Sequence, residues 1–165
     1  MIKRHLVPHA PPPPRGVKYH HATEADGWLY VTGQLPTDPA SPASALPSVV
    51  EAQAEQVFQN LKTIVEGAGY ALSDTVFVRI YLTQFKRDFD AFNQVYHRYF
   101  PDDRAVPSRT TIGVAELGHD ALVEVDLAST GPRRHDGGAG RLRPHGRRPC
   151  SRRRPGGRLD GNHGG

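Results

Sequence analysis

The residue composition changes abruptly at residue 131, and this change limits where a folded core can form. Residues 131–165 contain ten Arg, ten Gly and four Pro but almost no aliphatic residue, so they cannot bury enough apolar surface to offset the loss of conformational entropy on folding. Residues 1–130 are enough for one ordinary domain and too few for two. We therefore predict one folded domain, residues 1–130, followed by a disordered Arg-, Gly- and Pro-rich tail, residues 131–165.

The positive charge of the chain lies in this tail. The formal net charge is +4, whereas residues 131–165 alone carry ten Arg against Asp136 and Asp160, a balance of +8. Residues 1–130 hold 11 basic and 15 acidic residues, and this mildly acidic balance does not favour nucleic acid binding by the folded domain. The tail resembles an Arg-rich RNA-binding arm but has no aromatic residue to stack on a base. A shifted reading frame explains its composition equally well, and we expect it to have no defined function.

Cysteine usage and hydropathy favour a protein of the cytoplasm. The single cysteine, Cys150, excludes an internal disulfide and a cysteine-ligated metal site, as expected in a reducing compartment. The N-terminal residues lack the apolar stretch of a secretory signal, and no segment has the about 18 consecutive apolar residues that span a membrane. The histidines show no spacing typical of metal ligands, so we expect no metal; they include His20, His21, His97 and His119.

The clearest pattern in the chain is an apolar stripe over residues 50–68. An apolar residue recurs every three or four positions, at Val50, Ala54, Val57, Leu61, Ile64, Val65 and Ala68. This spacing predicts a helix of about 20 residues with one buried side. Ser48 is its expected N-cap, and Gly67 and Gly69 are expected to end it.

The remaining elements predict a single sheet. Alternation predicts a strand over Thr75–Leu82, and Asp88 is the expected N-cap of a second helix that runs through Phe100. Further strands are predicted at Lys3–Val7, Lys18–Thr23, Trp28–Thr32, Ser108–Val114 and Ala121–Leu127. This order favours an α+β fold with a mixed, mostly antiparallel sheet and two helices packed on one face. Phe77 and Tyr81 make the other face apolar, so we expect another subunit to cover it, the alternative being cover by the Pro-rich loops.

The last two predicted strands carry charged side chains that could form a site. The six residues between these strands permit an antiparallel hairpin, in which Arg109 would lie opposite Asp126 and diagonal to Glu124. An Arg on a strand suits a carboxylate ligand because its guanidinium donates two parallel hydrogen bonds. A nearby carboxylate can position or deprotonate a water molecule. The alternative is a structural ion pair of Arg109 with Asp126 or Glu124, which spacing alone favours.

Several motifs follow one another between Lys3 and Ser129. They are Val31-Thr32-Gly33-Gln34-Leu35-Pro36, Gln56–Gly69 with Asn60-Leu61, Phe89–Phe100 with Asn93 and Tyr96, Pro107–Val114, and Leu122–Asp126. In these motifs the chain resembles the Rid family of reactive intermediate imine/enamine deaminases, also called the YjgF family. The family's spacing of fifteen residues between its Arg and its Glu is kept between Arg109 and Glu124.

The resemblance implies a chorismate-mutase-like subunit of the YjgF type that packs as a homotrimer with clefts between neighbours. In deaminating members the Arg binds the carboxylate of a 2-imino or 2-amino-enoic acid, and the Glu positions the attacking water. The resemblance thus implies that Arg109 and Glu124 are the catalytic residues of a hydrolytic deaminase of the 2-iminobutanoate/2-iminopropanoate type. Such an enzyme releases a 2-oxo acid and ammonia and removes metabolites that damage other enzymes. No metal or organic cofactor is implied.

The resemblance also implies that Tyr19, Gly33, Asn93 and Thr111 bind the substrate. Thr111 stands where the best-studied deaminating branch has Cys, so a side branch with another substrate fits the sequence. Two other functions stay open. One is a trimer that binds small carboxylates without turnover, and the other is an RNA-interacting protein of the ribonuclease or translation inhibitor type.

Overall fold

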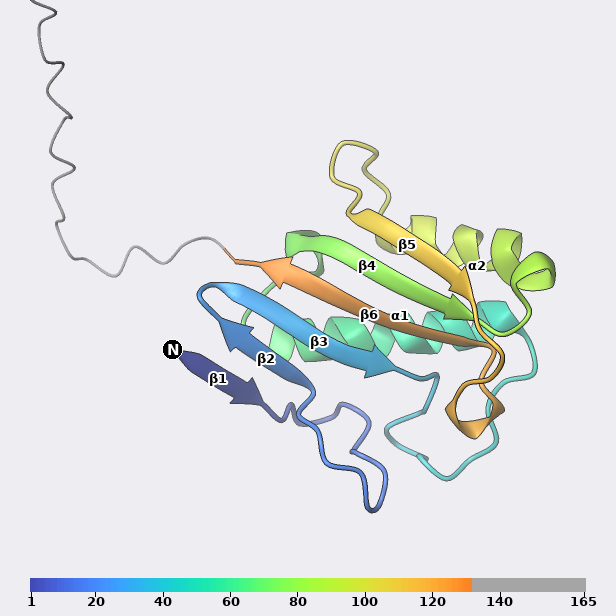
Figure 1. Ribbon diagram of the computed structural model, residues 1–165, viewed down its shortest axis with the longest axis horizontal. Coiled ribbons are helices and arrows are strands. Elements are labelled where there is room, and N and C mark those ends of the chain that lie inside the picture. The colour runs from blue at the N-terminus through green and yellow to red at the C-terminus, as the bar shows by residue number, and fades with distance from the viewer. Residues whose placement is uncertain (132–165) are drawn as a thin grey trace, which may run out of the picture. The chain divides into compact units, whose positions relative to one another are not determined.

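Six strands pair into one sheet within residues 1–131, the part of the chain that this computed structural model describes (Figure 1). The elements are β1 (Ile2–His5), β2 (Ala22–Ala25), β3 (Trp28–Gln34), α1 (Val50–Gly67), η1 (Leu72–Asp74), β4 (Thr75–Leu82), α2 (Phe85–Tyr99), β5 (Ser108–Gly113), η2 (Gly118–Asp120) and β6 (Val123–Thr130). The strand order is β1-β2-β3-β6-β4-β5, in which only β4 and β5 pair in parallel. The predicted α+β fold with a mixed, mostly antiparallel sheet is confirmed, and the predicted tail lies outside the described residues.

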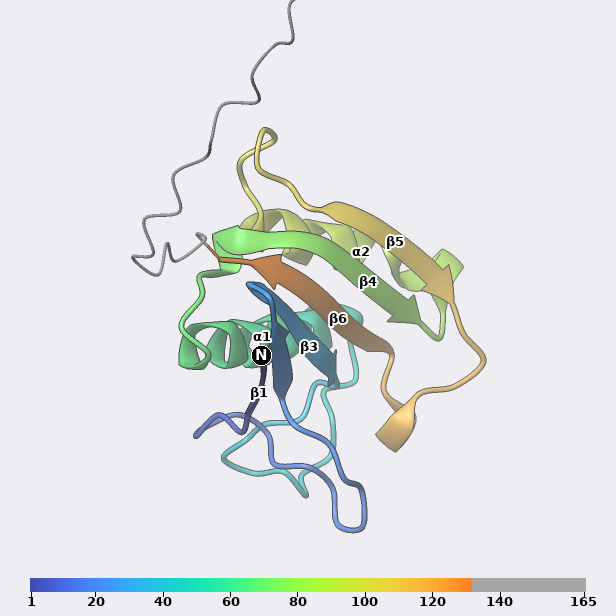
Figure 2. The same cartoon turned by 60° about the vertical axis from the view of Figure 1, so that its left-hand side comes forward.

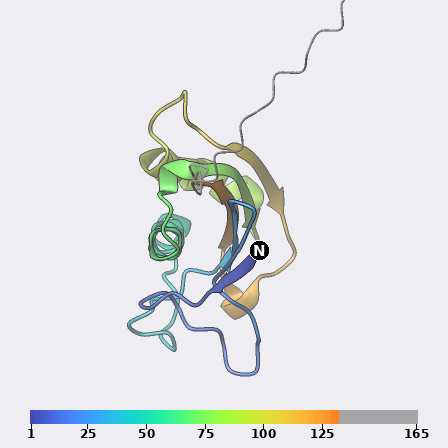
Figure 3. The same cartoon turned by 90° about the vertical axis from the view of Figure 1, so that its left-hand side faces the viewer.

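Both helices lie on one face of the sheet, as predicted and as Figure 3 shows. Alternate side chains of a strand point to opposite faces, and β4 and β6 direct six apolar side chains toward the helices. They are at most 2% exposed and comprise Val78, Ile80, Leu82, Val123, Val125 and Leu127. Phe58 of α1 packs against Phe92 and Tyr96 of α2, with ring centroids 6.0 Å apart in each pair. These rings and the strand residues form the core.

The first helix and the strand after it agree with the predictions. The apolar stripe of α1 is buried along its length, and β4 has the predicted bounds. The predicted cap is wrong, because Val49 precedes the first helical residue and no side chain caps the helix. Ser48 lies one residue before the N-cap position, so it is not the cap of this helix.

The second helix begins three residues before the predicted cap, Asp88. Phe85 stacks on Phe89 one turn further along, with ring centroids 5.0 Å apart, so the apolar side of the helix extends to its first residue. Asp88 instead lies in the first turn and accepts two hydrogen bonds from Arg87, 2.6 and 2.8 Å long. The cap prediction for Asp88 is therefore wrong.

A two-residue turn sets the register of β2 and β3. Asp26 and Gly27 both have positive φ angles, 51° and 83°, and Asp-Gly is a preferred sequence for such hairpin turns. Ala25 therefore pairs with Trp28. β2 continues to this turn, so the predicted strand Lys18–Thr23 lies too early in the chain.

The predicted hairpin between the last two strands is wrong. β6 lies between β3 and β4, while β5 pairs with β4 at the sheet edge, in front of α2 in Figure 2. β6 buries every second residue, whereas no residue of β5 is fully buried. β6 is therefore suited to the centre of the sheet and β5 to an edge. The helix α2 provides the long connection that a parallel pair requires.

The face opposite the helices carries no covering layer within residues 1–131 (Figure 3). Trp28, Tyr30 and Ile112 on this face are 42%, 54% and 44% exposed. Cover of this open face by another subunit stays a prediction. Neither α1 nor α2 is long and apolar enough to cross a bilayer.

A buried amide connects α1 to the loop that follows β3. Asn60 is 2% exposed, and its side-chain nitrogen donates to the carbonyls of Leu35 and Thr37, 3.1 and 2.9 Å away. Backbone carbonyls that are buried need such donors because water cannot reach them. Asn60 thereby fixes the course of the 35–37 segment.

Asn60→Ala is expected to lower the free energy of unfolding by about 1–3 kcal/mol, since two carbonyls lose their donor. Urea unfolding at fixed protein concentration measures the change. The matched control is Lys62→Ala on the exposed side of α1, where an ion pair with Glu66 is worth about 0.5 kcal/mol or less. Equal effects of the two substitutions would show that Asn60 does not hold this loop.

Candidate functional site

The six predicted site residues fall into two groups on opposite faces of the sheet. The helix-side group, from α2 and β5, consists of Asn93, Arg109 and Thr111. The open-side group, from the segment before β2, β3 and β6, consists of Tyr19, Gly33 and Glu124. The two groups do not share a face within one chain, so the predicted diagonal placement of Glu124 beside Arg109 is wrong.

Arg109 points from β5 toward α2, because it pairs with the inward-facing Val78 of β4. One Nη donates to Oδ1 of Asn93 at 2.8 Å, and Cζ lies 4.6 Å from the ring centroid of Tyr96 and 5.9 Å from that of Phe89. Cation–π contacts of this kind stabilise a guanidinium without neutralising it. The side chain is thus held in place by an amide and two rings.

No carboxylate within residues 1–131 forms an ion pair with Arg109. The predicted alternatives, an ion pair with Asp126 or with Glu124, are therefore wrong. Asp126 instead accepts from Nε of Arg79 at 2.9 and 3.1 Å and from the Tyr81 hydroxyl at 3.1 Å, on the open face. The positive charge of Arg109 stays available for an anion.

Thr111 lies two residues beyond Arg109 on the same face of β5. Its Oγ1 is buried and has no hydrogen-bond partner within residues 1–131. A buried hydroxyl without a partner costs about 1–3 kcal/mol. A polar ligand or a second subunit at this edge would supply the missing partner.

Glu124 points from β6 to the open face, where its carboxylate lies against the backbone of Gly33. A Cβ at position 33 would overlap Oε1 of Glu124, so a glycine is required here. Burial and the charge of Asp126 raise the pKa of Glu124 above its usual value. Burial and the charge of Glu124 raise the pKa of Tyr19.

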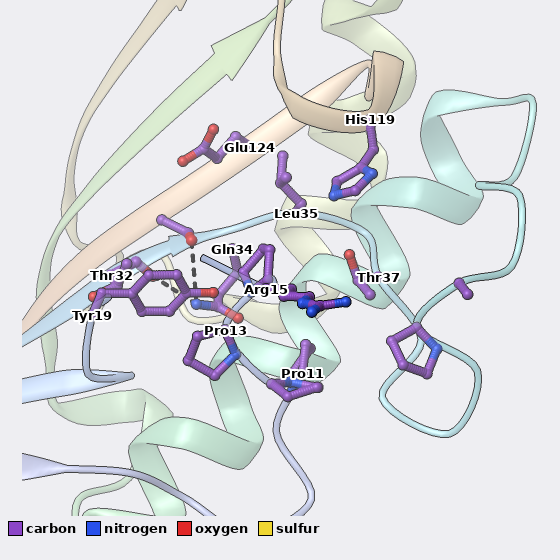
Figure 4. Close-up of a pocket in the computed structure, with 15 residues that line it drawn as sticks. Pro11, Pro13, Arg15, Tyr19, Thr32, Gln34, Leu35, Thr37, His119 and Glu124 are labelled. Atoms are coloured by element: carbon purple, nitrogen blue, oxygen red, sulfur yellow. Dashed lines mark hydrogen bonds between the residues drawn. The ribbon is translucent and has the colours of Figure 1, made fainter. Parts of the chain in front are cut away.

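A cavity of about 590 Å³ opens beside Glu124, within the range of about 300–1,000 Å³ typical of small-molecule sites. Figure 4 shows Tyr19, Thr32 and Glu124 at one end of it. Arg15 and His119 also line the cavity and were not among the predicted site residues. Both lie on loops, and no periodic pattern marks them.

His21 fixes one wall of this cavity. It is 3% exposed; its Nδ1 accepts from the backbone N–H of Val7 at 2.9 Å, and its Nε2 lies 2.9 Å from the carbonyl of Pro11. The bond to Val7 also explains why β1 ends at His5 and not at the predicted Val7. Residues 1–131 contain no group of three or more potential metal ligands.

The fold is that of a YjgF-type subunit. The solved structure of the YjgF gene product from E. coli has a TM-score of 0.69 and 27% identity, covering 78% of this chain and 98% of that one. E. coli TdcF with bound serine has a TM-score of 0.70 and 26% identity, covering 79% of this chain and all of that one.

The sequence comparisons give the family. The model of the endoribonuclease L-PSP family matches residues 9–130. A curated relative, the 3-aminoacrylate deaminase RutC of Acinetobacter baylyi, is 37% identical over 125 residues, which are 76% of this chain and 95% of the relative. The chain belongs to the endoribonuclease L-PSP family, the Rid or YjgF family that its motifs resemble.

Glu124→Gln is expected to raise the melting temperature at neutral pH. The raised pKa of Glu124 means that the folded state disfavours the charged carboxylate. Wild-type stability therefore falls as the pH rises from the pKa of an unfolded Glu, about 4.3, through the raised folded value. The Glu124→Gln variant does not lose this stability as the pH rises, because a glutamine side chain carries no carboxylate.

Thermal unfolding between pH 4 and pH 8 measures the difference, which should vanish at the acid end. Glu116→Gln, on an exposed loop position, serves as the control and should show no comparable gain. A glutamine variant that is less stable than the wild type at pH 7 would refute burial as the cause of the shift.

Proposed function

We propose that this protein is a hydrolytic deaminase of reactive 2-imino acids and their enamine tautomers. The proposal is supported chiefly by Arg109, a guanidinium that is positioned by Asn93 and Tyr96 but has no carboxylate partner within the described chain. A guanidinium in this state suits the carboxylate of a small acid. The deaminase name of the relative RutC and the serine bound to TdcF agree with such a ligand.

Glu124 is the proposed general base. Its raised pKa keeps it basic enough to take a proton from water as the water oxygen attacks C2 of the imine. In this step the O–C2 bond forms, the π bond of C=N breaks, and the proton passes through Glu124 to nitrogen, which gives a carbinolamine. Glu124 then moves the hydroxyl proton to nitrogen, so that the C–N bond breaks, ammonia leaves and the C=O bond of the 2-oxo acid forms.

The two groups of site residues meet, in this proposal, between copies of the chain. Arg109, Asn93 and Thr111 lie at the β5 edge of one copy, and Glu124 lies on the open face of the next, where the exposed aromatic residues need cover. A homotrimer closes such a contact into a ring and leaves no unpaired surface. Tyr19 and Gly33 complete the wall around the substrate.

Other parts of the proposal follow from composition. The mildly acidic charge of residues 1–130 does not support RNA cleavage by the folded domain, although the family carries an endoribonuclease name. We place the activity in the cytoplasm, without a metal or organic cofactor. Binding of a small carboxylate without turnover is the competing function, and an assay of ammonia release separates the two.

Arg109→Ala is expected to lower kcat/KM for a freshly generated 2-imino acid by about 10- to 150-fold, the loss of a charge-assisted hydrogen bond of about 1.5–3 kcal/mol. Glu124→Gln should lower kcat by about 10²- to 10⁴-fold. Arg104→Ala, at an exposed loop position, is the control. Ammonia release, followed by a coupled assay, reports each rate. Equal rates for Arg109→Ala and the wild type would end the deaminase proposal.

A mixture of the two impaired variants tests whether one site takes its residues from two copies. Arg109→Ala and Glu124→Gln are unfolded together in equal amounts and refolded. About a quarter of the sites then combine an intact Arg109 with an intact Glu124 from a neighbour. Recovery of about a quarter of the wild-type ammonia release is expected. No recovery, with mixed oligomers confirmed by mass spectrometry, would refute a site shared between copies.

A further inference from the structure

The cavity beside Glu124 has a second charged end that the proposed reaction does not use. Figure 4 shows Arg15 and His119 entering the cavity from two different loops, with the guanidinium of Arg15 directed toward Thr37 and with Tyr19 and Glu124 further to the left. No ion pair or hydrogen bond within residues 1–131 engages the side chain of either residue. One end of the cavity is therefore acidic and the other end basic.

A tight turn positions Arg15. The N–H of Val17 donates to the carbonyl of Pro14 at 3.0 Å, and Gly16 has a φ of +86°, as at the third position of a type II turn. Arg15 thus occupies the second position, at the corner. The Pro run before it restricts the backbone, and the contact of His21 with the Pro11 carbonyl at 2.9 Å fixes the start of this wall.

His119 is positioned by backbone geometry on the opposite wall. It lies in the one-turn helix η2 with φ and ψ of 57° and 27°, a left-handed conformation that His and Asn adopt more readily than most residues. Leu35 packs against the neighbouring Gly118, with its Cδ1 at 3.1 Å from the place of a Cβ. Asn60 in turn fixes the carbonyl of Leu35. Both basic groups are thus attached to well-fixed loops.

The size of the cavity leaves room beyond a small imino acid. Its volume of about 590 Å³ lies within the range of about 300–1,000 Å³ of pockets that take drug-sized ligands. A three- or four-carbon imino acid with its reacting carbon at Glu124 fills only part of this volume. The remainder extends toward Arg15 and His119.

We propose that Arg15 and His119 bind a second carboxylate, at the far end of the substrate, so that the enzyme prefers dicarboxylic 2-imino or enamine acids. This inference rests on the proposed function for the reaction at the near end. The far carboxylate is attracted by the guanidinium and kept away from Glu124 and Asp126 by their negative charge. The carboxylate at the reacting end of the substrate then binds Arg109.

Binding of the 2-oxo acid products tests the proposal without relying on catalysis. Isothermal titration of the full-length protein compares 2-oxoglutarate, with two carboxylates, and 2-oxobutanoate, with one. The wild type should bind 2-oxoglutarate more tightly. Arg15→Ala should weaken 2-oxoglutarate binding by about tenfold or more, as expected for loss of a charge-assisted hydrogen bond, and change 2-oxobutanoate binding less than twofold. His119→Asn, which tolerates the left-handed backbone, should act in the same direction.

Arg4→Ala is the matched control, because it removes the same charge from an exposed position on the edge strand β1. It should leave the affinity for both acids unchanged, and thermal unfolding confirms that each variant is folded. Equal weakening of both acids by Arg15→Ala would overturn the proposal, since Arg15 would then bind the carboxylate that both acids share. Unchanged affinity for 2-oxoglutarate in Arg15→Ala would overturn it as well.

The ammonia assay separates this inference from the proposed function. Arg15-dependent binding of 2-oxoglutarate without ammonia release would refute the deaminase and support the second carboxylate site. If ammonia is released without a preference for dicarboxylic substrates, and Arg15→Ala does not change the ratio of the rates for dicarboxylic and monocarboxylic substrates, the deaminase is supported and the second site is refuted.

Discussion

Strand β6 is hydrogen-bonded along both edges, to β3 and to β4, and this central position determines where the candidate site residues lie. Its apolar side chains are buried under the helices, so the side chains between them, Glu124 included, point to the open face. The same pairing leaves β5 at the edge, where Arg109 turns toward α2. The sheet itself therefore separates the two charged groups within one chain. Neither can neutralise the other there, and both stay available for a ligand.

Three of the candidate site residues lack the partner or the charge state that would favour folding most. The guanidinium of Arg109 has no acid, the hydroxyl of Thr111 has no partner within the described residues, and the carboxylate of Glu124 has a raised pKa. Such groups persist where the surrounding structure over-determines them. The ring cluster around Phe58 and the buried face of β6 supply that structure. The stability that the fold loses at these groups is consistent with a site that binds an anion and a water molecule.

Local pattern was enough to predict α1, β4 and the fold class, because each depends on residues close together in the chain. The pairing of β5 was not predictable in this way. A six-residue connection to β6 permits a hairpin, and the outcome depends on which strand buries more apolar surface between β3 and β4. Arg109 and Glu124 were found through the family motif, since spacing alone favoured an ion pair that the structure lacks. Arg15 and His119 were missed because distant contacts set the course of their loops.

The reacting end and the far end of the cavity are built from different kinds of structure. Glu124 and Gly33 lie on neighbouring central strands in direct contact, so any side chain at position 33 would displace the carboxylate of Glu124. Arg15 stands at the corner of a turn and His119 on a single helical turn, where substitutions leave the core untouched. The chemistry of the site is therefore constrained by the fold, whereas the choice of substrate depends on loops that can vary independently. A basic far end in this chain is thus a property of these loops and can differ between chains that share the same sheet.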